Sequence, residues 1–241
     1  MEFNNNNPID RADQSKAETM AQSFLANVFT YMSAALVITG IVAYWFGNDL
    51  SLMSLMFKPE GGMNLFGYFI LFAPLGLVLL MSARISKFSS TTLVALFILF
   101  SILMGMSLSS IFLIYTGASI VSTFFITAAT FGIMAVLGYT TKTDLTKFGS
   151  ILSMGVIGII IAMVVNMFLQ SGTMDYIISG IGVLIFTGLT AYDVQKLKRI
   201  GAGVEYGTEE TNKLSIMGAL SLYLDFINLF LFMLRFTGGR K

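Results

Sequence analysis

Long apolar segments separated by short polar ones dominate this chain. Seven segments approach the length of about 20 residues that a helix needs to cross a bilayer core of about 30 Å. They cover approximately Phe24–Phe46, Phe66–Ala83, Thr92–Ile114, Ile120–Gly138, Gly149–Leu169, Tyr176–Val194 and Leu214–Leu234. Several connections are short, which forces consecutive helices to run antiparallel. The pattern therefore predicts an all-α integral membrane protein, folded as a bundle of seven transmembrane helices.

The polar start of the chain and its composition refine this prediction. Residues 1–22 carry an asparagine run and mixed charges, so we expect a disordered cytoplasmic tail before a transmembrane domain at residues 23–241. The chain is 56% hydrophobic and 11% charged, with a net charge of +1 that gives no indication of a nucleic-acid partner. It has no cysteine and no histidine, so a titration near neutral pH would have to come from carboxylates.

The distribution of basic residues predicts the orientation of the bundle. Ten of the 14 lysines and arginines fall in the tail and in the connections after the second, fourth and sixth segments. Short loops rich in lysine and arginine stay in the cytoplasm. We therefore expect a cytoplasmic N-terminus and, with seven spans, a C-terminus on the opposite side.

Two aspartates interrupt the last two apolar segments. Asp193 lies near the cytoplasmic end of the sixth, and Asp225 lies about midway along the seventh. An ionised carboxylate at mid-membrane costs roughly 2.5 to 3.5 kcal/mol, and such residues usually mark an ion path, a proton relay or a catalytic pair. Helix positions alone separate the two by about 10 Å along the membrane normal. They meet only if the last helix begins outside the membrane core or tilts.

A meeting of the two aspartates would create a pH-dependent site. Two carboxylates in a low-dielectric site cannot both ionise easily, so they titrate as a unit. Arg84, at the cytoplasmic end of the second segment, would favour their charged form. The carboxylates of Asp193 and Asp225 would also offer a weak calcium site. Asn228, one turn beyond Asp225, and Asn166, in the fifth segment, are candidate supporting polar residues, with helix packing as the alternative role.

The surroundings of the two aspartates resemble a known family. The stretches TGLTAYDVQKLK (187–198) and ALSLYLDFINLFLFMLR (219–235) are similar to the transmembrane Bax-inhibitor-motif family, in its bacterial branch. The resemblance implies a central helix surrounded by the others, and a pH-sensitive calcium leak channel in the bacterial inner membrane. By motif it assigns Asp193 and Asp225 as the pH sensor, and by helix position it adds Arg84 as their partner. Calcium would be a permeant or weakly bound ion, and no tightly bound cofactor is expected.

Other functions stay open at this point. Some bacterial relatives modulate a membrane-bound AAA protease, which implies a regulatory protein that acts through its tail, and a proton/calcium exchanger is a further alternative. An intramembrane aspartyl protease would also carry two aspartates on successive helices, one in a Tyr-Asp motif such as Tyr192-Asp193. Such enzymes need Gly-x-Gly-Asp at the second aspartate, where this chain has LYLD at residues 222–225. We therefore expect no enzymatic activity.

Overall fold

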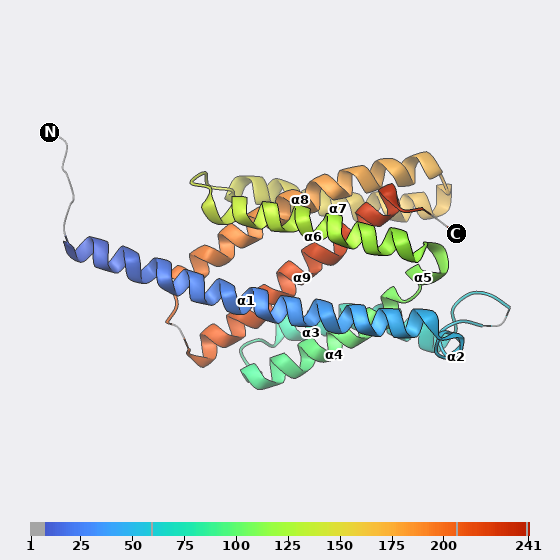
Figure 1. Ribbon diagram of the computed structural model, residues 1–241, viewed down its shortest axis with the longest axis horizontal. Helices are drawn as coiled ribbons and strands as arrows, with labels where there is room; N and C mark the ends of the chain where they lie inside the picture. Colours follow the sequence, from blue (N-terminus) through green and yellow to red (C-terminus); the bar gives the residue numbers. More distant parts are fainter. Residues whose placement is uncertain (1–7, 59, 206, 240) are drawn as a thin grey trace.

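The computed structural model describes residues 8–58, 60–205, 207–239 and 241. The described chain is helical throughout its regular elements (Figure 1), with the bounds α1 (Pro8–Asn48), α2 (Leu50–Ser54), α3 (Leu65–Ala83), α4 (Ser90–Leu108), α5 (Ile111–Ile114), α6 (Gly117–Thr140), α7 (Thr146–Leu169), α8 (Gly172–Ala202) and α9 (Glu209–Thr237). Within the described residues, seven helical stretches are long and apolar enough to cross a membrane, one of them formed by α4 together with α5. The predicted fold class is confirmed.

Polar capping residues determine where most of these helices begin. The first residue outside five of them is Asn, Ser or Thr, and its side-chain oxygen accepts a hydrogen bond from a backbone N–H in the first turn. These residues are Asn64, Ser89, Thr116, Ser171 and Thr208. Such caps satisfy backbone donors that have no partner within the helix. The helices therefore extend a few residues beyond the apolar segments from which they were predicted.

The first helix corrects our expectation for the N-terminal tail. Residues 8–22 form the beginning of α1, whereas we expected them to be disordered. They contain alanine, glutamine, glutamate and lysine, which favour helix, and no glycine. Pro8 occupies the first helical position, where its missing N–H costs no hydrogen bond. Ala21 is already buried, close to Gly201 of α8, so residue 22 marks no structural boundary. Residues 1–7 of the expected tail lie outside the described residues.

The most buried helix is the last one. Helices α1, α4, α6 and α8 all pack against α9, which crosses the bundle obliquely (Figure 1). In its most apolar stretch 67% of the residues are buried, compared with 11% in α7. The peripheral helices α3 and α7 pack mainly against α4 and α8, respectively. This confirms the prediction of a central helix and identifies it as α9.

Glycine permits the closest helix contacts. A Cβ atom on Gly138 of α6 would lie 2.2 Å from the backbone oxygen of Ala191 in α8. A Cβ atom on Gly105 of α4 would lie 2.7 Å from the backbone oxygen of Thr39 in α1. Small residues let helix backbones approach each other in this way in membrane proteins. Helix α6 is therefore held close to α8, and α4 is held close to α1.

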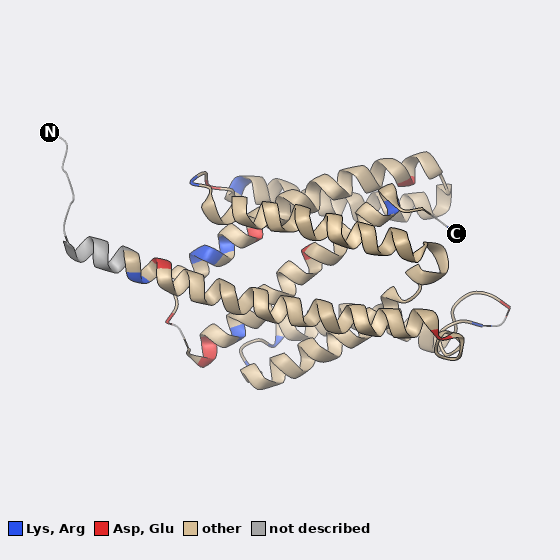
Figure 2. Ribbon diagram, in the orientation of Figure 1, with Lys and Arg blue, Asp and Glu red and all other residues tan. Residues whose placement is uncertain are grey.

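Most of the charged side chains gather at one end of the bundle. This end, which we call the basic end, contains the connections at residues 84–89, 141–145, 203–205 and 207–208. Figure 2 shows most of the lysines and arginines toward it, together with several acidic residues. The arrangement agrees with the loops from which the orientation was predicted, and the side of the membrane that the basic end faces stays a prediction.

Candidate functional site

Asp193 of α8 and Asp225 of α9 meet inside the bundle, toward the basic end. Asp225 is only 7% exposed, and Asp193 is partly buried. The two carboxyl groups lie close enough for a side-chain hydrogen bond and for direct charge interaction. Ser221, one turn before Asp225, donates a hydrogen bond of 2.7 Å to Oδ2 of Asp193. The structure thus brings the two predicted aspartates together and adds a serine hydroxyl to them.

The course of the two helices explains why the aspartates meet. Helix α9 begins at Glu209, before the apolar segment that starts near Leu214, and it is oblique to its neighbours. Helix α8 continues to Ala202, so Asp193 lies within it and not at its end. These two features remove the difference in depth that simple helix positions suggested.

One oxygen of Asp225 lacks a hydrogen-bond donor. Among the described residues none donates to Oδ2 of Asp225, although this atom is buried. A buried polar atom without a partner is unfavourable by about 1 to 3 kcal/mol, and is therefore rare. A single proton on either carboxyl group would supply a donor between Asp193 and Asp225. The geometry is thus compatible with a hydrogen bond between the two carboxyl groups.

A lysine of α8 lies near enough for its charge to act on the pair. Lys196 follows Asp193 by three residues on α8, and its charge acts on Asp225. Arg84 ends α3, where its side chain is exposed and makes no hydrogen bond or ion pair within the described chain. Because α3 packs mainly against α4, the structure does not bring Arg84 to the aspartates. The role of Arg84 as their partner stays a prediction.

The two candidate asparagines have local partners. The amide of Asn228 donates to the backbone oxygen of Leu224 in its own helix. Asn166 lies near the end of α7, where its side-chain oxygen accepts a hydrogen bond from the backbone of Ser171. Ser171 and Asp193 are separated by more than twenty residues of α8, or about 30 Å. Asn166 therefore lies at the α7–α8 turn, and the structure does not bring it to the pair.

A buried hydroxyl network lies two residues from Asp225 and was not predicted. The Tyr223 hydroxyl is 2.7 Å from Oγ1 of Thr39, which also contacts the backbone oxygen of Ser101 at 2.9 Å. Tyr223 is fully buried, and its ring meets Phe97 and Phe100 edge-on. The network joins α9 to α1 and α4. Its residues are polar positions in apolar segments, but sequence alone does not indicate which helices are neighbours.

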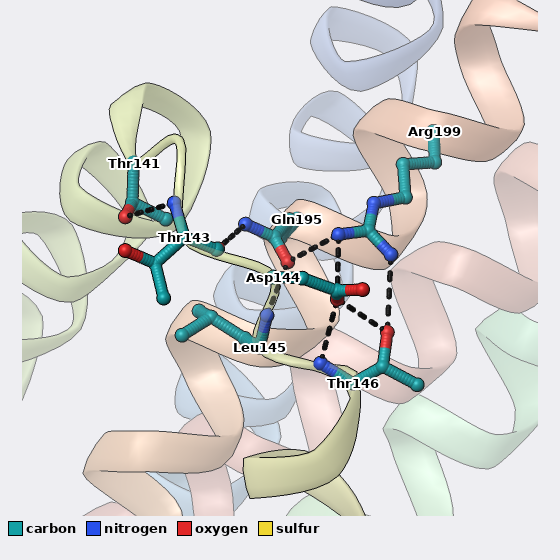
Figure 3. Close-up of polar contacts among 7 residues, drawn as sticks. All are labelled: Thr141, Thr143, Asp144, Leu145, Thr146, Gln195 and Arg199. Atoms are coloured by element: carbon teal, nitrogen blue, oxygen red, sulfur yellow. Dashed lines mark hydrogen bonds and ion pairs between the residues drawn. The ribbon is translucent and has the colours of Figure 1, made fainter.

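A second polar network fixes the α6–α7 connection to α8 at the basic end (Figure 3). Oδ1 of Asp144 accepts hydrogen bonds from the backbone and the hydroxyl of Thr146, and it pairs with the Arg199 guanidinium at 2.7 Å. The bonds from Thr146, followed by the Arg199 contact, hold the pKa of Asp144 well below its ordinary value of 3.8. Asp144 therefore stays ionised at neutral pH and cannot sense changes there.

Gln195 connects this network to the helix that carries Asp193. Its amide donates to the backbone oxygen of Thr143 at 2.8 Å, and its oxygen accepts from the backbone of Leu145 at 2.9 Å. The same oxygen accepts from Arg199 at 2.9 Å (Figure 3). Because Gln195 lies only two residues after Asp193, the connection restrains α8 next to the carboxyl pair.

These observations define an integral membrane protein with a carboxyl pair inside its helical bundle. The sequence profile of the family described as "Inhibitor of apoptosis-promoting Bax1" matches residues 21–241. The chain therefore belongs to this family, the Bax-inhibitor family. The resemblance carried by residues 187–198 and 219–235 is confirmed.

Bacterial relatives match the chain over nearly its whole length. It is 46% identical over 221 residues to the inner membrane protein YbhL of Escherichia coli (strain K12), covering 91% of this chain and 93% of the relative. It is 46% identical over 233 residues to a protein of Borreliella burgdorferi, with coverages of 97% and 99%. A protein of Caulobacter vibrioides is 42% identical over 243 residues, with coverages of 97% and 95%. The name of the E. coli relative agrees with the localisation expected for this chain.

Proposed function

We propose that this protein is a pH-sensitive calcium leak channel of the bacterial inner membrane, with Asp193 and Asp225 as its pH sensor. The observation that carries the proposal is the buried carboxyl pair in which Oδ2 of Asp225 lacks a donor. Such a pair holds one proton or loses it according to pH, and the change alters both charge and hydrogen bonding. Carboxylates inside a membrane protein are a general feature of ion and proton pathways.

The pair is suited to a cation that passes and does not stay. Calcium takes about six to eight oxygen ligands. Asp193 and Asp225 supply two carboxylates, and among the described residues no three acidic side chains gather to hold a metal ion. Backbone oxygens and water would have to complete the shell. Weak binding of this kind favours conduction, because an ion must leave the site as readily as it enters.

In the conformation described here, apolar side chains pack around the part of α9 that follows Asp225. They would block an ion path that leads from the basic end past Asp225. The next residue, Phe226, meets Phe124 and Phe131 of α6 edge-on, with ring centres 5.6 and 5.5 Å away. Further along α9, Phe230 and Phe232 are buried as well. An ion that reaches Asp225 from the basic end therefore meets aromatic side chains. We infer that conduction requires α6 and α9 to separate, and that a change of charge at Asp225 favours or opposes this movement through its neighbour Phe226.

Calcium flux into dye-loaded proteoliposomes tests this function. We would measure it from about pH 6 to about pH 8, a range around neutral pH. The wild type should pass calcium at a rate that varies with pH, and Asp193→Asn or Asp225→Asn should flatten the variation. Glu18→Gln is a matched control, because Glu18 is an exposed carboxylate on α1. Equal pH on both sides of the membrane separates a leak from a proton-driven exchanger.

Two outcomes would contradict the proposal. A wild-type protein that passes no calcium at any pH would exclude the channel function and favour a regulatory protein. A pH dependence that survives in both aspartate variants would show that the sensor lies elsewhere.

A further inference from the structure

An apolar groove opens on the side of the bundle between α1 and α6. Its volume is about 940 Å³, and α1 and α6, which form its walls, do not pack closely against each other (Figure 1). Val194 of α8 and Phe226 of α9 contribute to its floor. The groove thus reaches the two helices that carry the carboxyl pair, at the residues that directly follow Asp193 and Asp225.

Two glycines widen this groove. Gly40 of α1 and Gly132 of α6 both line it, and a Cβ atom on either would meet no atom within 4 Å. These glycines therefore differ from Gly138, where a Cβ atom would collide with α8. The space in front of Gly40 and Gly132 is open to the surroundings of the bundle. Because α1 and α6 are long and apolar enough to cross a membrane, we expect hydrocarbon there.

The groove is long enough to hold a lipid tail along its whole length. Its α1 wall runs from Gln22 to Gly40, about 27 Å at the rise of an α-helix. This exceeds the roughly 15 Å of one leaflet of the bilayer core. Both walls belong to membrane-spanning helices. Apolar surface in this position is covered by acyl chains or by another protein, because no water is present there.

An unpaired cation lies at the basic end of the groove and favours a lipid as the occupant. The Lys198 ammonium donates to the backbone oxygen of Tyr139 at 2.9 Å and lies 4.4 Å from the centre of its ring. Tyr139 lines the groove. No carboxylate of the described chain pairs with Lys198. An apolar groove that ends at a fixed positive charge is complementary to an acyl chain attached to an anionic head group.

We propose that this groove binds one acyl chain of an anionic phospholipid from the leaflet at the basic end, with the phosphate beside Lys198. The tail would lie against Phe124, Phe131 and Phe226, the aromatic side chains that separate in the channel proposed above. Control of conduction by the lipid would rest on that proposed function. The binding itself does not, and it can be measured without any flux.

Fluorescence quenching by brominated lipids tests the binding. Trp45 is the single tryptophan of the chain, so Trp45→Phe combined with Phe29→Trp places one reporter in the groove. The protein is reconstituted in phosphatidylcholine vesicles that contain phosphatidylglycerol or phosphatidylcholine with brominated tails. Phosphatidylglycerol should quench at a mole fraction about fivefold lower, the preference expected from one lysine beside an anionic lipid. Lys198→Gln should remove this preference.

Variants that fill the groove separate a defined site from general contact with lipid. Gly132→Leu or Gly40→Leu should reduce quenching by both lipids, because the new side chain occupies the space of the tail. Gly158→Leu in α7 is the matched control, since a Cβ atom there also meets nothing within 4 Å but the residue does not line the groove. Equal quenching by both lipids, unchanged in Gly132→Leu, would overturn the proposal. Absence of quenching would overturn it too, and would indicate that a protein helix or a second copy covers the groove.

Discussion

In the hydroxyl network around Tyr223, the direction of the hydrogen bonds predicts which of two substitutions destabilises the fold more. The single hydroxyl proton of Thr39 is directed to the backbone oxygen of Ser101, which can only accept. The Tyr223 hydroxyl is therefore the donor in its 2.7 Å contact with Thr39. Thr39→Val and Tyr223→Phe, which both remove this contact, should consequently destabilise the fold to different extents.

The smaller effect is expected for Tyr223→Phe. This substitution leaves the Thr39 donor bonded to Ser101, so it should cost about 0.6 to 1 kcal/mol, the usual value of a hydrogen bond between membrane helices. Thr39→Val leaves the Tyr223 hydroxyl buried without an acceptor, at a cost of about 1 to 3 kcal/mol. The ring cannot turn away, because Phe97 and Phe100 pack against it. The double variant, Thr39→Val with Tyr223→Phe, leaves no buried hydroxyl without an acceptor and should be more stable than Thr39→Val alone.

Unfolding in mixed detergent micelles, titrated with a denaturing detergent, measures these differences. Thr30→Val is a matched control on the same helix, because the Thr30 hydroxyl is exposed and bonds only within α1. It should change stability little. A larger loss for Tyr223→Phe than for Thr39→Val, or strictly additive losses in the double variant, would refute the assigned direction of the bonds.

Two further predictions concern the basic end and the closest helix contact. Asp144→Asn should speed amide hydrogen exchange at residues 141–146 and leave the pH dependence of flux unchanged. Because the pKa of Asp144 is lowered from 3.8, its contact with Arg199 contributes its full stability above pH 3.8 and loses it only as the pH falls below that value. A transition in the exchange of the wild type near neutral pH would contradict this prediction. Gly138→Leu would place a Cβ atom 2.2 Å from Ala191 and should cost about 3 kcal/mol or more. In thermal unfolding Gly132→Leu should be tolerated, and equal stability of the two variants would exclude this contact.

The seven spans were predictable because the bilayer itself imposes the length of each apolar segment. The residues at which the helices begin and end were less predictable. Residues 8–22 are polar enough to look disordered, yet they continue a helix that is already nucleated by the membrane-spanning part of α1. The break between α4 and α5 lies within one apolar segment and left no signal that hydrophobicity could show.

Part of the candidate site was also predictable from the apolar segments. A carboxylate in an apolar segment is conspicuous, which identified Asp193 and Asp225. Their neighbours depend on how the helices are placed around α9, and short antiparallel connections do not determine this. Arg84 has a suitable depth but belongs to a peripheral helix, whereas Lys196 follows Asp193 on α8 itself. Thr39 and Tyr223 are 184 residues apart, so their contact is visible only in the folded bundle.

The central position of α9 has a consequence for biosynthesis. All the other spans leave the ribosome before α9, so they enter the membrane while the middle of the bundle is still vacant. Alone in lipid, α9 would carry Asp225 at a cost of roughly 2.5 to 3.5 kcal/mol. By that time, however, α8 is present to receive the carboxyl group beside Asp193. We therefore expect α9 to insert as the bundle closes around it, and a nascent chain interrupted before Glu209 lacks the centre of the protein.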